Sequence, residues 1–134
     1  IAITGNNGKT KTKELINEVL STTYKTYTTE GNLKNHIGVP LTILKIKPDA
    51  EMAVIEMGAN HLKEIAGYCE YAMPTHGLIT NIGKAHLEGF GSVENVKKGN
   101  GEFCDYLRKH KCKAFVNKDD ESLVQLRNGI NEVI

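Results

Sequence analysis

Short apolar runs alternate with helical stretches along this chain, and this alternation limits the possible fold more than any other feature. Five runs fit strands, at residues 1–4, 24–28, 52–55, 77–80 and 114–117. Stretches with helical character separate or follow them, at 9–20, 38–46, 61–72 and 92–109, and from residue 119 or 120 onward. Strands that alternate with helices build a mostly parallel sheet. The sequence therefore predicts an α/β fold of three layers, with helices on both faces of the sheet.

Composition excludes several classes of protein. The 134 residues fit one domain, and a formal net charge of +1 leaves no electrostatic footprint for nucleic acid. No apolar run approaches the roughly 20 residues that a membrane-spanning helix needs. The three cysteines, Cys69, Cys104 and Cys112, lack CxxC spacing, so we expect buried free thiols in a reducing compartment rather than disulfides or a zinc site.

A glycine-containing loop between the first strand and the first helix has the chemistry of a phosphate site. Its residues are Gly5, Asn6, Asn7, Gly8, Lys9 and Thr10. Backbone N–H groups and the helix N-terminus would face an anion, Lys9 would neutralise phosphates, and the Thr10 hydroxyl can ligate Mg²⁺. Only two residues separate the glycines, so the alternative is a plain turn before a lysine-rich helix. Lysines at positions 9, 11 and 13 favour the phosphate site, because cations at a helix N-terminus need an anion.

The carboxyl ends of the apolar strands carry further polar residues. Ligands of such sheets bind beyond these ends, so Thr4-Gly5, residues 56–58 and Thr80-Asn81 are expected to converge at one edge. Glu56 alone fits a loop cap or a metal ligand, and a neighbouring phosphate loop favours Mg²⁺. A lone loop histidine such as His86 is ordinarily a surface hydrogen-bonding group, as we expect of the remaining histidines.

Taken together, these motifs resemble the central domain of the Mur ligases, ATP-dependent amide-bond-forming enzymes of bacterial cell-wall synthesis. The matching segments run from end to end, at 4–10, 29–32 with 37–40, 54–58, and 80–81 with 85–87. The resemblance implies a P-loop-type nucleotide-binding domain in a cytoplasmic, monomeric bacterial enzyme of peptidoglycan synthesis, on which cell shape and cell division depend. Residues 85–91 are most similar to the branch that joins D-Ala-D-Ala to UDP-MurNAc-tripeptide.

The resemblance also implies roles for single residues. ATP would phosphorylate the carboxylate of the tripeptide, and the amine of D-Ala-D-Ala would attack the acyl phosphate. Lys9 and the loop amides would stabilise the transferring phosphoryl group, with the backbone of Lys11 beside the nucleotide. Thr10 and Glu56 would hold one Mg²⁺ and His86 a second, while Asn32 would lie near the γ-phosphate.

Three positions depart from the family pattern. Lys11 stands where Ser or Thr is usual, and Lys34 where Asn is usual. Asn100 precedes Gly101-Glu102, where the family has a carbamylated lysine that helps hold the second Mg²⁺. Lys97, one helical turn earlier, is a better replacement than Lys98, two residues earlier, because it lies nearer the same helix face.

The resemblance predicts that residues 1–134 are a partial central ATP-binding domain, without the N-terminal UDP-sugar domain and the C-terminal domain. We then expect ligase activity in a longer parent protein, whereas the chain alone binds nucleotide only. Lys11 and Asn100 leave open a degenerate, non-catalytic nucleotide-binding module. A related ligase acting on folylpolyglutamate or an amino-acid polymer is a further alternative, since substrate choice depends on the other domains.

Overall fold

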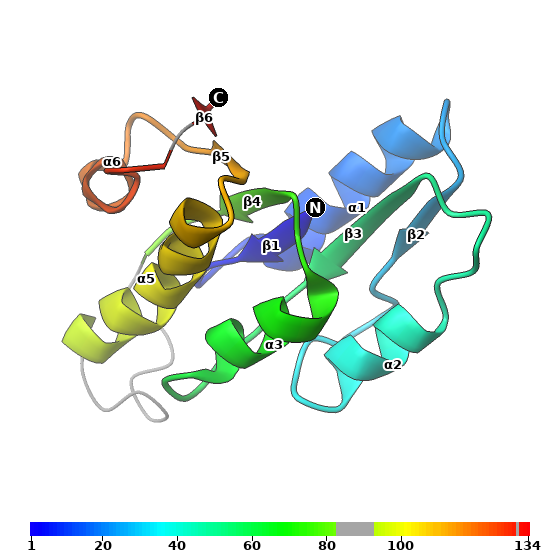
Figure 1. Ribbon diagram of the computed structural model, residues 1–134, viewed down its shortest axis with the longest axis horizontal. Helices are drawn as coiled ribbons and strands as arrows, with labels where there is room; N and C mark the ends of the chain where they lie inside the picture. Colours follow the sequence, from blue (N-terminus) through cyan, green and yellow to red (C-terminus); the bar gives the residue numbers. More distant parts are fainter. Residues whose placement is uncertain (83–92, 131) are drawn as a thin grey trace.

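The computed structural model describes residues 1–82, 93–130 and 132–134, which form a six-stranded, fully parallel sheet (Figure 1). The strands are β1 (Ala2–Thr4), β2 (Thr26–Thr28), β3 (Met52–Glu56), β4 (His76–Ile79), β5 (Lys113–Phe115) and β6 (Glu132–Val133). Their order across the sheet is β2-β3-β1-β4-β5-β6. The predicted α/β fold is confirmed, and the edge strand β6 is the strand that the sequence patterns missed.

The helices cover both faces of this sheet. They are α1 (Lys9–Ser21), α2 (Gly38–Leu44), α3 (Glu64–Ala72), α5 (Val93–Lys109) and α6 (Glu121–Leu126). The chain moves one way across the sheet from β1 to β2 and the other way from β3 to β4. Right-handed crossovers therefore place α1 and α3 on opposite faces. Figure 1 shows α1 behind the sheet and α2, α3 and α5 in front of it, and α3 packs against both α2 and α5.

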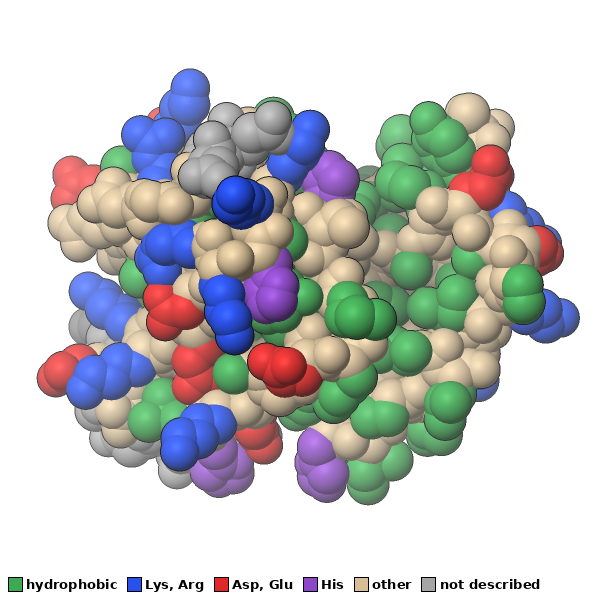
Figure 2. Space-filling view, viewed as in Figure 1, with side chains coloured by type: hydrophobic (Ala, Val, Ile, Leu, Met, Phe, Trp, Pro, Cys, Tyr) green, Lys and Arg blue, Asp and Glu red, His purple; other side chains and the backbone are tan. Residues whose placement is uncertain are grey.

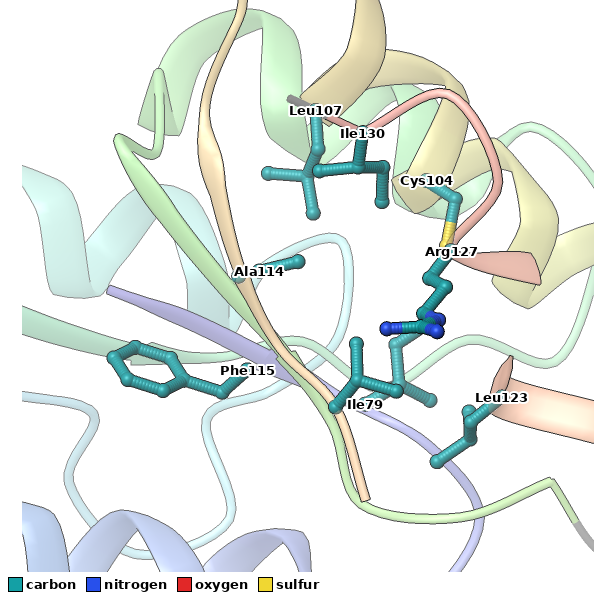
Figure 3. A pocket seen from close by; sticks show the side chains of 10 residues that line it. Ile79, Cys104, Leu107, Ala114, Phe115, Leu123, Arg127 and Ile130 are labelled. Atoms are coloured by element: carbon teal, nitrogen blue, oxygen red, sulfur yellow. The ribbon is translucent and has the colours of Figure 1, made fainter. Parts of the chain in front are cut away.

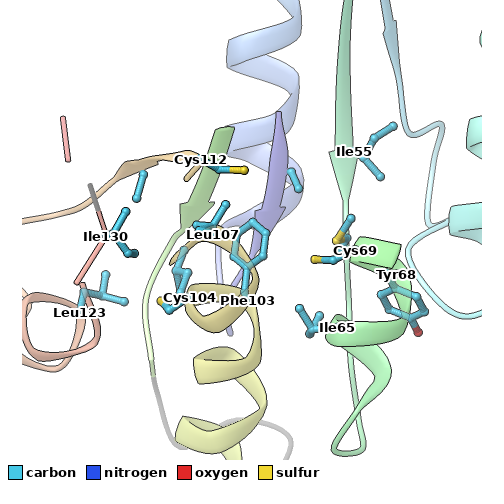
Figure 4. Close-up of a cluster of buried hydrophobic side chains, with 14 of the residues drawn as sticks. Ile55, Ile65, Tyr68, Cys69, Phe103, Cys104, Leu107, Cys112, Leu123 and Ile130 are labelled. Carbon is cyan, nitrogen blue, oxygen red and sulfur yellow. The ribbon is translucent and has the colours of Figure 1, made fainter. Parts of the chain in front are cut away.

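The hydrophobic core lies between the sheet and the helices in front of it (Figure 4). Phe103 and Leu107 of α5 pack directly on β4 at Gly77, where a Cβ atom would lie 2.5 Å from Leu107 Cδ1. Glycine is needed there because any side chain would push α5 away from the sheet. The three cysteines are free and buried in this core, as the sequence predicts.

Helix α1 does not follow its apolar pattern. Lys9 and Lys13 are buried, whereas Leu15 and Val19 are 68% and 69% exposed. Near α2, the side chains of Ile37, Leu41 and Leu44 are also exposed. Hydrophobic side chains gather on that part of the face shown in Figure 2. Apolar spacing therefore predicts that a helix forms, but not which of its faces meets the sheet.

A small apolar gap separates α6 from the rest of the core (Figure 3). Its volume is about 20 Å³, and its lining includes Ile79, Cys104 and Leu123. A space of this size holds a single water at most. Helix α6 begins where the sequence predicts, because Asp120 Oδ1 accepts hydrogen bonds from the N–H groups of Ser122 and Leu123 at 3.0 and 3.3 Å. No helix of the described chain is long and apolar enough to cross a membrane.

Candidate functional site

The loop between β1 and α1 lies at the point where the strand order reverses. Its first residue, Gly5, has a φ of 120°, and Gly8 has a φ of 82°. A Cβ atom on Gly5 would lie 2.3 Å from Thr80 Oγ1 at the end of β4. Both glycines are therefore required by backbone conformation, and Gly5 is also required by the close approach of β4. Crevices at such reversal points are where parallel α/β sheets bind ligands.

Asn81 holds this loop to the end of β4. Its carbonyl accepts from Asn6 N at 3.1 Å, and its side-chain Oδ1 accepts from Asn7 N at 3.0 Å. Its Nδ2 also donates to Asn7 O at 2.9 Å. The sequence patterns placed Asn81 at this sheet edge without a role. The pairing could not be found from sequence, because the two segments are 74 residues apart.

The N-terminus of α1 is open to an anion. Gly8 is the N-cap residue, and neither a side-chain cap nor an acidic residue in the first turn satisfies the helix N–H groups. Lys9 Nζ folds back to donate to Gly5 O at 2.6 Å and Asn6 O at 2.9 Å. Burial lowers the pKa of the Lys9 ammonium, the nearby Lys34 charge lowers it further, and Glu56 opposes the shift. The start of α1 thus combines a buried cation with helix N–H groups that no described side chain caps.

Glu56 ends β3 with a fully buried side chain beside this loop. Its Oε1 accepts from Thr10 Oγ1 at 3.0 Å and lies 3.2 Å from Lys34 Nζ. Its Oε2 is buried and has no hydrogen-bond partner in the part of the chain that the structure describes. A buried carboxylate oxygen without a partner is unfavourable, so this atom has unused capacity to accept a hydrogen bond or to bind a cation. Thr10 and Glu56, to which the family resemblance assigns one Mg²⁺, are therefore in direct contact.

The segment after β2 closes another side of the site. Thr29 is buried; its Oγ1 accepts from Glu56 N at 2.9 Å, and its carbonyl accepts from Lys13 Nζ. Lys34 O accepts from Gly58 N at 2.7 Å, which ties the segment to the residues after β3. The side chain of Asn32 is exposed, and its carbonyl accepts from Lys34 N at 2.9 Å.

Asn100 of α5 lies beside the phosphate-type loop. Together with Gly5 and Asn6 it lines a small cavity, and its Nδ2 donates to Val96 O at 2.9 Å. Lys97, which the sequence suggests as a replacement for a lysine at position 100, lines a different, open groove with Lys98. The structure thus places the Lys97 side chain in a different space from that of Asn100, and not beside the loop.

The sequence also predicts roles for Lys11 and His86. The Lys11 side chain is exposed on α1. His86 lies outside the described residues. The structure brings together the loop, Glu56 and Asn81 at one sheet edge, as predicted from the ends of the strands. Thr10 lies against Glu56 there, and the side chains of Thr29 and Lys34 join them.

Comparisons with known proteins identify the family to which this fold belongs. A model of the Mur ligase middle domain matches residues 3–133. The UDP-N-acetylmuramoyl-tripeptide–D-alanyl-D-alanine ligase of Escherichia coli is 44% identical over 130 residues, which cover 97% of this chain and 28% of that enzyme. Two solved structures each superpose with a TM-score of 0.90 over 99% of the chain: MurF from Acinetobacter baumannii, at 33% identity, and MurF ligase from Thermotoga maritima in complex with ADP, at 32%.

The match covers only part of each relative. The chain corresponds to 30% of the Acinetobacter baumannii chain and 31% of the Thermotoga maritima chain, so it spans less than a third of these proteins. Within that part, the family model covers almost every residue and the solved relatives share the fold. This chain belongs to the Mur ligase middle-domain family.

Proposed function

We propose that this chain is the ATP-binding part of a ligase that joins D-Ala-D-Ala to UDP-MurNAc-tripeptide. The reaction proceeds through an acyl phosphate on the tripeptide. One observation carries the proposal: the N-terminus of α1, the Lys9 ammonium and Glu56 Oε2, which has no hydrogen-bond partner among the described residues, lie at one edge of the sheet. The names of the relatives support the substrates, and the ADP complex of one relative supports the nucleotide.

The donor set fits Mg²⁺. This ion prefers oxygen ligands, commonly one or two carboxylates together with phosphate oxygens. Thr10 Oγ1 and the Glu56 carboxylate supply such oxygens 3.0 Å apart, and Glu56 Oε2 has no described partner. We propose that these two residues hold Mg²⁺ and that His86 holds a second ion. Bound there, the metal would neutralise phosphate charge.

The chain's own residues would bind and orient the nucleotide. Lys9 would exchange the carbonyls of Gly5 and Asn6 for phosphate oxygens, and the N–H groups at the start of α1 would donate to the same phosphates. Asn81 keeps the loop in register with β4 while this exchange occurs. Asn32, exposed after β2, would contact the γ-phosphate and the acceptor carboxylate.

Calorimetric titration with ATP and Mg²⁺ tests the binding step. We expect Lys9→Ala to weaken ATP binding by about 10- to 100-fold, because it removes charge-assisted hydrogen bonds worth roughly 1.5–3 kcal/mol. Lys109→Ala is the matched control, since Lys109 is exposed at the end of α5. Equal affinity of Lys9→Ala and the unchanged chain would contradict the phosphate-site assignment.

A second candidate function is nucleotide binding without ligation. The neutral, buried Asn100, whose amide already donates to Val96 O, favours it. A full-length protein carrying this sequence distinguishes the two functions. Phosphate release that requires both UDP-MurNAc-tripeptide and D-Ala-D-Ala supports the ligase. Binding of ATP without release, with any amine acceptor, supports the degenerate module, whereas release with another acceptor supports a related amide ligase.

A further inference from the structure

Lys34 is the described residue whose position at the nucleotide site is least expected from the sequence. The main chain anchors it twice, because its N–H donates to Asn32 O at 2.9 Å and its carbonyl accepts from Gly58 N at 2.7 Å. Its side-chain stem lies over Gly58, where a Cβ atom would approach Lys34 Cγ to 3.0 Å. Backbone and stem therefore aim the ammonium at the end of β3.

The Lys34 ammonium forms an ion pair with Glu56, the carboxylate that we propose binds Mg²⁺. Lys34 Nζ is 3.2 Å from Glu56 Oε1, the same oxygen that accepts from Thr10 Oγ1. The Glu56 side chain is fully buried, whereas the Lys34 side chain is 32% exposed. Pairing stabilises a buried carboxylate that would otherwise be uncompensated, and the partial exposure of Lys34 leaves its ammonium a route away from Glu56.

A divalent cation and an ammonium compete for one carboxylate. Both need the negative charge of Glu56, and two cations within a few ångströms of each other repel strongly in a partly buried site. A metal that binds Glu56 must therefore displace the Lys34 ammonium or bind beside it at reduced affinity.

We propose that the Lys34 ammonium pairs with the Glu56 carboxylate when no metal is bound, and that Mg²⁺ displaces it when nucleotide binds. Lys34 thereby sets the Mg²⁺ concentration at which this site is half saturated. The inference rests on the proposed ATP-binding function and deepens it. Without metal, Lys34 and Lys9 supply two positive charges near the phosphates. With metal, the anchored stem of Lys34 keeps its displaced ammonium close to the nucleotide. Lys34 is thus a positioning residue that supports ATP binding in the absence of Mg²⁺ and raises the Mg²⁺ concentration at which the metal replaces it on Glu56.

Calorimetry of ATP binding in EDTA and over a Mg²⁺ series tests this inference. In Lys34→Met, which keeps the stem over Gly58, we expect the half-saturating Mg²⁺ concentration to fall by about three- to tenfold, because an ion pair of this exposure is worth about that much. We expect ATP binding in EDTA to weaken severalfold in the same variant. Lys34→Arg, which keeps the charge, is expected to change neither quantity appreciably.

The matched control is Lys45→Met. Lys45 belongs to an exposed ion pair in the same region, but its partner is Glu30 at 2.6 Å rather than Glu56. Its removal is expected to leave both titrations unchanged. Thermal unfolding checks that each variant is folded, and Lys34→Gln repeats the measurement if Lys34→Met is not.

The outcomes separate the two proposals. Binding of ATP that depends on Lys9, with the same Mg²⁺ requirement in Lys34→Met as in the unchanged chain, overturns the role of Lys34 and leaves the ATP site intact. Absence of ATP binding at every Mg²⁺ concentration overturns the proposed function and the inference with it. A lowered Mg²⁺ requirement in Lys34→Met and not in Lys45→Met supports both.

Discussion

The three lysines at the start of α1 show how a helix distributes neighbouring charges. The sequence interpretation treats Lys9, Lys11 and Lys13 as one cluster that expects an anion. In the structure the Lys9 ammonium donates to carbonyls of the loop, and the Lys11 side chain is exposed. Lys13 is buried, and its ammonium donates to Thr29 O. Positions 9 and 13 share a helix face because they are four residues apart, whereas position 11 points elsewhere. The role of Lys13 is therefore to join α1 to the segment after β2.

Glycine substitutions test the loop at this scale. We expect Gly5→Ala to lower the free energy of unfolding by about 2 kcal/mol or more, because its φ of 120° is strained for alanine and the new Cβ meets Thr80. Gly67→Ala, in α3 with nothing within 4 Å, is expected to raise it by about 0.5–1 kcal/mol. Urea unfolding measures both. A Gly5→Ala protein as stable as the unchanged chain would contradict the observed loop geometry.

Helices α3 and α5 are joined by a polar contact as well as by the core. Glu102 of α5 accepts from Lys63 N at 2.6 Å and from Ala66 N at 3.3 Å, so it caps α3 from a neighbouring helix. Lys63 itself has a φ of 71° and provides no side-chain cap. The sequence motif identifies Glu102 only as part of a Gly-Glu pair. Its capping partner lies 39 residues earlier, beyond the reach of local pattern analysis.

Removal of this cap tests the link between the two helices. We expect Glu102→Ala to lower the free energy of unfolding by about 1–2 kcal/mol, the range seen when helix N-caps are removed. Glu102→Gln, which retains an acceptor oxygen, is expected to lose less than half of that. Glu94→Ala is the control, because the contact of Glu94 within the described residues is an exposed ion pair with Lys98. Thermal unfolding measures these variants. A loss of stability in Glu102→Ala no larger than that in Glu94→Ala would contradict the capping role.

Strands and helices differ in how well local pattern predicts them. The apolar runs of β1, β3 and β4 contain buried residues, and their positions were predicted within one residue. Strand β6 has two residues, too few for any periodicity, and it exists because β5 offers an edge to pair with. For α1 the exposed Leu15 and Val19 mislead, because the face that meets the sheet is set by the crossover from β1 to β2.

The core of the whole molecule keeps its thiols protonated. Burial raises the pKa of Cys69 to about 12 and that of Cys104 to about 11. Since the thiolate is the reactive form, we expect both thiols to react with a disulfide reagent at pH 8 at least about 100-fold more slowly in the folded protein than in urea. Rapid reaction of these two cysteines without denaturant would show that the core is open.

The same pKa values give stability a defined pH dependence. Unfolded thiols titrate near their ordinary pKa of 9.0, whereas the folded ones titrate near 11 to 12. Thiolate formation therefore stabilises the unfolded chain first, and the contribution of these groups to stability falls from about pH 9 upward. Urea unfolding at pH 8 and pH 10 measures this decline, and Cys69→Ala is expected to reduce it.

The sequence by itself determined the parallel α/β fold and the convergence of the loop after β1 with residues 56–58 and Asn81 at one edge of the sheet. These features follow from local apolar runs and from the rule that ligands of parallel sheets bind where the strands end. The pairing of Thr10 with Glu56 was expected only from the resemblance to the family. Only the tertiary structure decided that Asn81 holds the loop, that Lys13 is buried and that Lys34 lies on Glu56. The physical reason is that these contacts join segments distant in the sequence, and burial decides which of many similar polar residues meet.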